Sequence, residues 1–304
     1  MSFSNDVRQE ICSSISDKDK RFACLYGMLL FGRELSREQV CFQTESPVAA
    51  KQFSELFRAV FKEEIHCREH IRKSGAVLYI YEISDTELIG SIFSKYRLSG
   101  EKRMINSEII STSSLGVFAA GVFLACGSVN DPSKEYHLEF TVSEEGLASQ
   151  LSALLGDIGV TSGIMTRRGQ FVVYIKGSES IEDTLTFIGA QQCTLELINV
   201  KIYKDVRNKA NRLANCDAAN IDKVVSAAMK QIEDITYIEK SKGLDFLSDE
   251  LRELAELRLE NVDMSLQEIG DSLSVPISRS GVNHRFKKLA KIADEIRSEE
   301  KRNE

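Results

Sequence analysis

Two apolar segments of similar composition, 94 residues apart, constrain the fold of this 304-residue chain more than any other feature. Residues 23–32 and 117–126 contain no charged side chain and are rich in small residues. A helix that is apolar all round has to be buried on all sides. Glycines such as Gly27 and Gly121 let two backbones approach closely. We therefore expect the two segments to form helices that pack on each other at a pseudo-twofold axis.

The segments that follow the two apolar helices also resemble each other in pattern. After the first come strand-like residues 39–44, a helical segment over 47–62, strand-like residues 65–71 and 76–83, and a helix over 85–96. After the second come an alternating strand over 136–142, a helix over 144–156, strands over 160–167 and 170–176, and a helix over 181–188. The sequence thus predicts an α+β domain over residues 1–190, with two α-β-α-β-β-α repeats at about 20–97 and 114–190. Its two sheets are expected to flank the helix pair and form one continuous saddle.

The strand patterns end at about residue 191, which predicts an all-α second part. We expect a linker helix within residues 191–218, from Thr194 to about Leu213. A second helix is expected over Ala219–Ile238, with one face formed by Ile221, Val224, Val225, Ala228, Ile232 and Ile235. Ser248 can cap a third helix. Residues 219–304 are therefore predicted to form a separate helical domain.

Composition excludes several classes of protein. The chain has three prolines and no low-complexity tract, so long disordered segments are not expected. Its longest uncharged apolar helical segment, residues 116–127, is shorter than the roughly 20 residues that span a membrane. Seven cysteines without a C-x-x-C pair favour a reduced, cytosolic chain over a disulfide framework or a thiolate zinc site. With no secretory signal and no nucleotide-binding glycine motif, we expect a cytoplasmic protein without a cofactor.

A helix-turn-helix pattern lies near the C-terminus, at about residues 265–298. Ser265 and Glu268 have the spacing of a capping box at the start of a short helix. Pro276 blocks its continuation, and Ser278 or Ser280 can open the last helix. One face of that last helix is apolar and carries Val282, Phe286, Leu289, Ala293 and Ile296. A short capped helix, a turn and an amphipathic helix form the layout of a helix-turn-helix.

The opposite face of the last helix predicts a surface for double-stranded DNA. The segment from Arg279 to Lys291 holds five basic side chains, His284 and no acid. The residues expected to contact DNA are Ser278, Arg279, Ser280, Asn283, His284, Arg285, Lys287, Lys288 and Lys291. Those near the start of the helix could reach base edges or flanking phosphates, and the lysines would neutralise phosphates. The alternative is a solvated basic face on an ordinary terminal helix.

Several segments resemble the WhiA family, bacterial regulators of sporulation and cell division. They are residues 277–285 (Ile-Ser-Arg-Ser-Gly-Val-Asn-His-Arg), 121–132 with 136–139, and 208–216 with 219–223. The match follows chain order and is most distinct from about Leu115 onward. The resemblance implies a LAGLIDADG homing-endonuclease-like domain followed by a helix-turn-helix. It also implies a nucleoid-associated DNA-binding protein that regulates transcription or supports cell division and chromosome segregation, and sporulation where the organism sporulates.

The resemblance allows a check for a retained nuclease. Aligning Gly27 and Gly121 with the glycine of the homing-endonuclease motif places Gly32 and Cys126 where those enzymes carry metal-binding acids. Neither side chain can supply a hard oxygen ligand to Mg²⁺. We therefore expect no enzyme activity and no metal, and an active endonuclease is the disfavoured rival. The segment over residues 65–70, with His66, Cys67 and His70, offers a weaker metal-binding alternative.

Charge is distributed unevenly along the chain. The net charge is −7, and residues 1–190 hold 20 basic and 25 acidic side chains. This balance argues against a DNA clamp in the first domain, whose saddle is expected to bind a protein or a small ligand. A basic run of Lys201, Lys204, Arg207, Lys209 and Arg212 is either a solvated linker helix or a second phosphate contact. A cell-division scaffold with minor DNA contact is the alternative function.

Overall fold

At the centre of the N-terminal part, the two apolar segments form helices that pack closely on each other. The computed structural model describes residues 2–99 and 102–303 and divides into two compact units, Met1–Val206 and Arg207–Glu304. In the first unit, α2 runs over Lys18–Leu30 and α5 over Leu115–Cys126. A Cβ atom on Gly27 would lie 2.3 Å from the carbonyl oxygen of Phe118, and one on Gly121 would lie 2.1 Å from that of Cys24. No side chain fits at either position, so the predicted close contact is confirmed.

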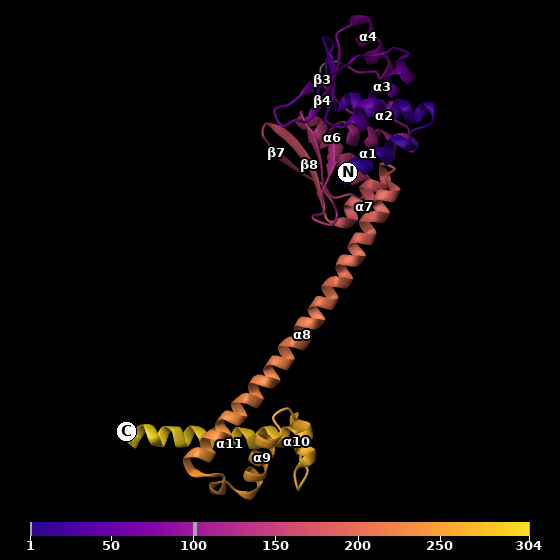
Figure 1. The fold of residues 1–304 in the computed structure, drawn as a ribbon. Coiled ribbons are helices and arrows are strands. Elements are labelled where there is room, and N and C mark those ends of the chain that lie inside the picture. The colour runs from indigo at the N-terminus through magenta and orange to yellow at the C-terminus, as the bar shows by residue number, and fades with distance from the viewer. Residues whose placement is uncertain (1, 100–101, 304) are drawn as a thin grey trace. The chain divides into compact units, whose positions relative to one another are not determined.

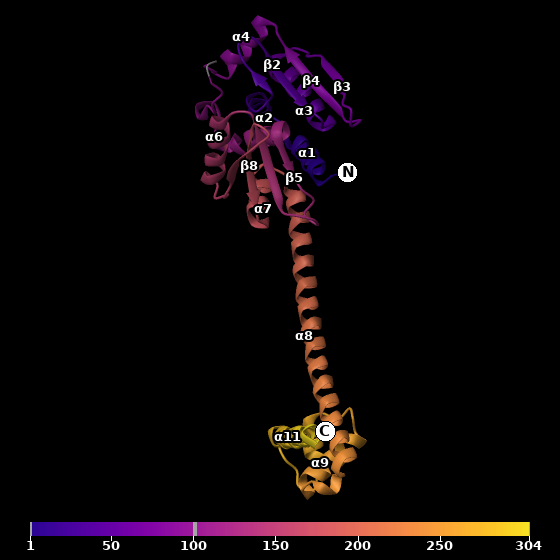
Figure 2. The same ribbon diagram turned by 90° about the vertical axis from the view of Figure 1, so that its left-hand side faces the viewer.

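Each apolar helix is followed by a four-stranded antiparallel sheet (Figures 1 and 2). The first repeat continues with β1 Glu34–Leu35, β2 Val40–Thr44, α3 Pro47–Phe61, β3 Cys67–Ile71, β4 Val77–Ile83 and α4 Thr86–Lys95. The second continues with β5 Gly127–Val129, β6 His137–Val142, α6 Glu145–Asp157, β7 Gly163–Arg167, β8 Gln170–Lys176 and α7 Ser178–Phe187. The strand orders, β1-β2-β4-β3 and β5-β6-β8-β7, are equivalent. This equivalence confirms the duplication.

The N-terminal unit differs from the prediction in three respects. Each repeat has one more strand, β1 or β5, and these are too short to show an alternating pattern. The two sheets are separate in the described part of the chain, so they do not form one continuous sheet. An additional helix, α1, runs over Phe3–Ser14 and buries Phe3, Val7 and Ile11. Short 3₁₀ turns at Ser107–Ile109 and Thr112–Ser114 precede α5.

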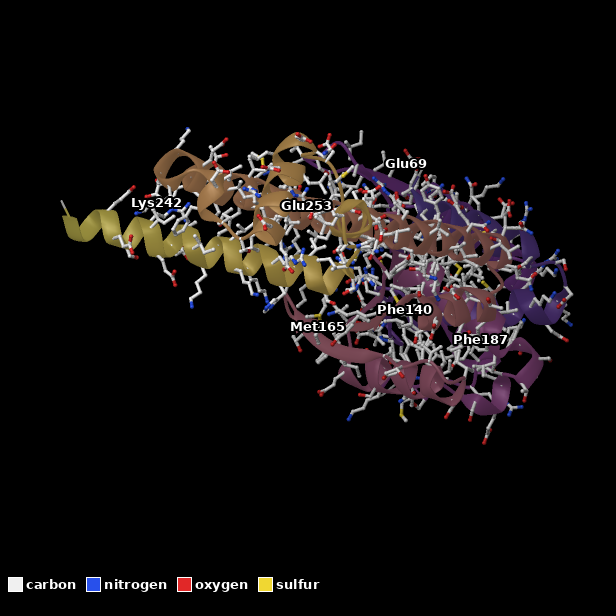
Figure 3. All side chains as sticks on the ribbon, turned by 90° about the horizontal axis from the view of Figure 1, so that it is seen from below. Glu69, Phe140, Met165, Phe187, Lys242 and Glu253 are labelled. Carbon is white, nitrogen blue, oxygen red and sulfur yellow. The ribbon has the colours of Figure 1, made fainter. Side chains whose placement is uncertain are left out.

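A single hydrophobic cluster fills the interior between the helices and the sheets of this unit. The rings of Phe42 on β2 and Phe53 on α3 stack with their centres 4.2 Å apart. The Tyr81 hydroxyl on β4 donates to the carbonyl oxygen of Ala50 at 2.9 Å. Figure 3 shows Phe140 among packed side chains and Glu69 at the outer edge. The helices therefore cover one face of each sheet and leave the other face open.

The C-terminal unit is helical, as predicted. Its elements are α8 (Gln191–Lys242) from Arg207 onward, a 3₁₀ turn at Leu244–Phe246, α9 Asp249–Glu260, α10 Leu266–Ser272 and α11 Arg279–Asn303. The expected break between Leu213 and Ala219 is wrong, because α8 is one helix of 52 residues. Neither glycine nor proline occurs between residues 191 and 242, so no residue there breaks the helix. The helix ends before Gly243. The φ of this residue is 79°, which is incompatible with a right-handed helix.

A second hydrophobic cluster joins α9, α10 and α11 to the end of α8. It includes Ile235 and Ile238, but Ile221, Val224 and Val225 on the predicted apolar face of α8 are 62%, 59% and 52% exposed. Helical spacing alone therefore does not predict which apolar side chains of α8 are buried. Ser248 occupies the N-cap position of α9, yet its side chain makes no capping hydrogen bond. Within residues 2–99 and 102–303, no helix has the length and apolarity to cross a membrane.

Candidate DNA-binding interface

The short helix α10 begins and packs as its sequence predicts. The Ser265 hydroxyl accepts from the Glu268 amide at 3.3 Å, and the Glu268 carboxylate accepts from the Ser265 amide at 2.7 Å. This is a complete capping box. Gly270 lies against the following turn, where a Cβ atom would sit 2.4 Å from the carbonyl oxygen of Ile277. The Ile277 amide donates to the Gly270 carbonyl oxygen at 3.1 Å, so the turn packs directly against α10.

The turn between α10 and α11 is anchored to α9. Glu253 accepts from the Ser274 hydroxyl at 2.6 Å and from the Ser274 amide at 2.5 Å. These two hydrogen bonds lower the pKa of Glu253 from its ordinary value. Ser278 then opens α11, because its hydroxyl accepts from the Gly281 amide at 3.3 Å. Of the two serines that the sequence offers as the start of this helix, Ser278 is therefore the N-cap residue.

The apolar face of α11 is buried as the helical wheel predicts. Val282, Phe286, Leu289, Ala293 and Ile296 are all at most 4% exposed and belong to the second cluster. On the other face, Ser278, Arg279, Ser280, Asn283, His284, Lys287, Lys288 and Lys291 are exposed. The structure thus brings eight of the nine expected contact residues to the surface along one helix.

Arg285 is the exception among the expected contact residues. Its guanidinium pairs with Glu250 on α9 at 3.0 Å, and its side chain is 16% exposed. It ties α11 to α9. Lys291 is exposed but lies 3.7 Å from Glu295 one turn along the helix, a weak surface pair.

The exposed face has a charge that suits an anionic ligand. Among the described residues, Arg279, His284, Lys287 and Lys288 have no side-chain ion pair or hydrogen bond. Arg279 stands at the N-terminus of α11, where free amides and the helix dipole add partial positive charge. A helix N-terminus with such side chains can bind phosphate oxygens. Asn283 can offer both a donor and an acceptor beside them.

The second basic run, on α8, separates into two groups. Lys201 pairs with Glu182 at 3.3 Å and with Glu179 at 3.6 Å. Lys204 donates to the carbonyl oxygen of Pro132 at 2.7 Å. These two lysines therefore have partners within the N-terminal unit. Arg207, Lys209 and Arg212 are exposed without partners in the part of the chain that the structure describes.

Comparison with known proteins identifies the family. The WhiA LAGLIDADG-like domain matches residues 115–207, and the WhiA C-terminal HTH domain matches residues 210–293. A protein of Clostridium acetobutylicum named "Probable cell division protein WhiA" is 38% identical and covers 98% of this chain and 99% of its own length. The chain belongs to the WhiA family. A Clostridium tetani protein of the same name is 36% identical over 98% of the chain.

A solved structure supports the fold of this WhiA chain. Full-length DUF199/WhiA from Thermotoga maritima superposes with a TM-score of 0.60 and covers 97% of this chain and 99% of its own. Its sequence is 24% identical, so the likeness shows the fold. The expected resemblance, the α+β class and the C-terminal helix-turn-helix are thereby confirmed.

In this WhiA chain, the C-terminal ends of α2 and α5, the two helices that pack on each other between the repeats, lack carboxylates. Gly32 follows α2, and Cys126 is the last residue of α5. Burial raises the pKa of the Cys126 thiol to about 12, which keeps it neutral. His66, Cys67 and His70 are exposed, and no group of three His, Cys, Asp or Glu in the described residues could hold a metal.

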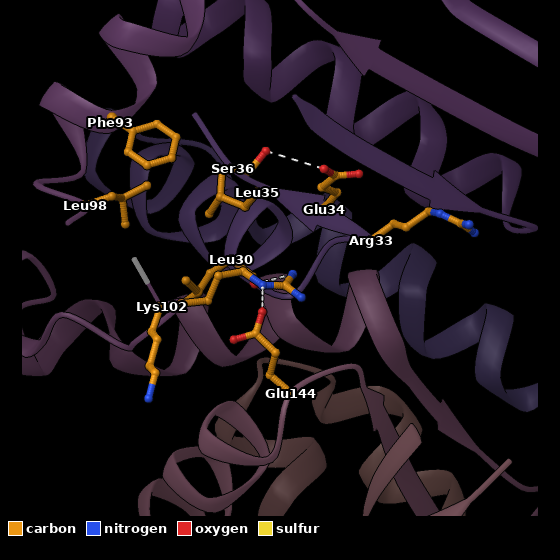
Figure 4. Close-up of a pocket in the computed structure, with 10 residues that line it drawn as sticks. Leu30, Arg33, Glu34, Leu35, Ser36, Phe93, Leu98, Lys102 and Glu144 are labelled. Carbon is orange, nitrogen blue, oxygen red and sulfur yellow. Dashed lines mark hydrogen bonds and ion pairs between the residues drawn. The ribbon is translucent and has the colours of Figure 1, made fainter. Parts of the chain in front are cut away.

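The side chain of Arg103, which the sequence did not single out, occupies the space beside the C-terminal ends of α2 and α5. The Arg103 guanidinium donates to the carbonyl oxygens of Gly32 at 2.7 Å and Leu30 at 3.3 Å. It also bonds the Glu144 carboxylate and the Ser143 hydroxyl of the second repeat. Leu30, Arg103 and Glu144 line a pocket, and in Figure 4 the Glu144 carboxylate points into it toward Leu30. Arg103 lies between the repeats, where neither repeat's pattern could assign it.

Proposed function

We propose that this WhiA chain binds double-stranded DNA through the exposed face of α11 and regulates transcription or cell division. The observation that carries the proposal is the group of unpaired side chains on one face of α11, a helix positioned by the turn after α10: Arg279, His284, Lys287 and Lys288. The second helix of such a motif enters the major groove, where its N-terminal residues can reach base edges. Arg279 and Asn283 would read bases, and Lys287 and Lys288 would contact phosphates.

The test compares binding of the full chain to genomic DNA fragments at about 50 and 200 mM salt. We expect the wild type to select particular fragments. A variant with Arg279, Lys287 and Lys288 changed to alanine should lose this binding, and its log-affinity should depend less steeply on log salt, by about 0.9 per lost phosphate contact. Lys230→Ala with Lys240→Ala, two exposed lysines of α8, is the matched control. Equal binding by the triple variant would contradict the proposal.

The exposed group on α8 is proposed as a second phosphate contact. Arg207, Lys209 and Arg212 lie within about two turns of one helix and have no competing carboxylate partner among the described residues. Changing them to alanine should weaken binding to all fragments alike and leave the preferred fragments unchanged. A changed preference would contradict a purely phosphate-binding role.

We propose further that the chain is not a nuclease. Gly32 and Cys126 offer no hard oxygen ligand, and the Arg103 cation beside Gly32 disfavours Mg²⁺ by charge repulsion. A plasmid-nicking assay with Mg²⁺ should show no cleavage above the level without protein. Cleavage that is lost on changing Glu144 to glutamine would contradict this part of the proposal.

The open sheet faces of the N-terminal unit are proposed to contact a protein partner at the nucleoid rather than DNA. Their arginines already have carboxylate partners: Arg68 pairs with Glu82 at 3.0 Å, and Arg167 pairs with Glu139 at 2.7 Å. Phosphates would have to compete with these pairs. The curated relatives are named cell division proteins, which favours a partner in that process. Equal DNA affinity of residues 1–206 and the full chain would contradict this assignment.

A further inference from the structure

Arg258 on α9 is a buried cation without a carboxylate partner in the described part of the chain. The residue is 2% exposed, and its Nη1 donates to the carbonyl oxygens of Val262 at 3.2 Å and Met264 at 2.8 Å. The guanidinium lies 5.3 Å from the ring centre of Phe286. Its Nε is buried and has no acceptor. Burial lowers the pKa of the Arg258 guanidinium, because an incompletely paired charge is unfavourable in an apolar environment.

Arg258 lines an apolar groove of about 630 Å³ within the C-terminal unit. One wall is the part of α8 that bears Val224, Val225 and Met229, and the other includes Val262. Met229 is 63% exposed, and Val262 is 48% exposed. Three of the described lining residues are cations, Lys223, Arg258 and Arg279, and one is an acid, Asp263. The groove thus combines apolar walls with an excess of positive charge.

We propose that this groove binds a small amphipathic organic acid, with its carboxylate toward Arg258 and its apolar body against Val224, Val225 and Met229. Binding sites for small molecules are mostly apolar, have volumes of roughly 300–1,000 Å³ and contain a few polar groups that fix orientation. The Oε1 of Gln231 in the same groove also lacks a partner. Rotation of that amide would present its NH₂ group to the carboxylate.

The size of the groove is that of a small-molecule site. At about 630 Å³ it can enclose an alkyl chain or an aromatic ring system. Burial of Val225 and Met229 by such a body would remove apolar surface from water and stabilise the complex.

The ligand would also affect the α11 face. Arg279 lines the groove and is the first residue of α11. A carboxylate near Arg279 would compete with phosphate for the same guanidinium. This coupling rests on the proposed DNA binding through α11, whereas the binding of the acid itself does not. Acid and DNA should therefore each weaken the other's binding by the same factor.

The first experiment measures dodecanoate binding to the full chain by titration calorimetry below the critical micelle concentration. We expect one saturable site per chain. Met229→Glu, an exposed position in the groove wall, should weaken binding at least tenfold because it adds a carboxylate to the apolar wall. Phe246→Glu is the matched control, since Phe246 is 60% exposed and lies outside the groove. Circular dichroism checks that both variants are folded.

Two further probes separate the alternatives. Dodecyltrimethylammonium, with the same chain and the opposite charge, should bind at least tenfold more weakly than dodecanoate. Equal affinity for both, or equal dodecanoate affinity of Met229→Glu and wild type, would overturn the proposal. So would a dimer that dissociates on adding dodecanoate, because a second copy would then be the occupant. If dodecanoate binds as expected but DNA affinity does not change, only the coupling through Arg279 is wrong.

Discussion

Single residues determine how closely the two repeats approach each other. At Gly121 and Gly27 the backbones of α5 and α2 touch, and any Cβ atom would overlap a carbonyl oxygen of the other helix. Arg103 completes the same junction, since it binds carbonyl oxygens at the end of α2 and a carboxylate of the second repeat. The last carbonyls of a helix carry partial negative charge, so a cation there is favourable. Arg103 therefore links the end of α2 to the second repeat.

The Gly121→Ala variant tests the close contact. The added Cβ atom would lie 2.1 Å from the Cys24 carbonyl oxygen, and a backbone atom cannot rotate away. We expect the free energy of unfolding of the N-terminal unit to fall by about 3 kcal/mol. Gly146→Ala on α6 is the control, because a Cβ atom there meets nothing within 4 Å. Chemical denaturation of the full chain measures both, and equal midpoints would contradict the tight contact.

Among the elements, those with strong local signals were predictable. The capping box of α10, the turn and the apolar face of α11 appear as the sequence indicates, because each depends on neighbouring residues. The continuity of α8 was not predictable from Asn215 and Asp217, which are poor helix formers but do not break a helix. The ion pair of Arg285 joins two helices, and no local pattern distinguishes it from the exposed lysines. A contact between residues distant in sequence thus determines the role of Arg285.

The anchoring of the α10–α11 turn predicts a pH dependence. The Ser274 hydroxyl and amide lower the pKa of Glu253 in the folded chain. Its contribution to stability is therefore fully present above the ordinary Glu value of about 4.3 and is lost as pH falls through the lowered folded value. We expect Glu253→Gln to destabilise the C-terminal unit by about 1 kcal/mol at neutral pH. The difference should shrink in acid. Thermal unfolding against pH measures it, with the exposed Glu256→Gln as control.

For the whole molecule, the described core residues form two clusters rather than one. The first fills the N-terminal unit, and the second joins α9, α10, α11 and the end of α8. Between them, residues 207–227 of α8 are exposed. Sequence periodicity indicated two domains but could not place this exposed segment, because Ile221 and Val224 have the same spacing as the buried Ile235. Which apolar side chains are buried depends on what packs against them.

Two separate clusters predict two unfolding transitions. Each cluster can lose its packing while the other remains intact, so the chain as a whole is not expected to unfold in a single two-state step. Gly121→Ala should lower the midpoint of one transition and leave the other unchanged. Gly270→Ala should do the reverse, because its Cβ atom would lie 2.4 Å from the Ile277 carbonyl oxygen in the second cluster. Differential scanning calorimetry of the full chain measures both midpoints. A single transition shifted by both variants would mean that α8 couples the two cores, and DNA binding through α11 should then stabilise the N-terminal unit as well.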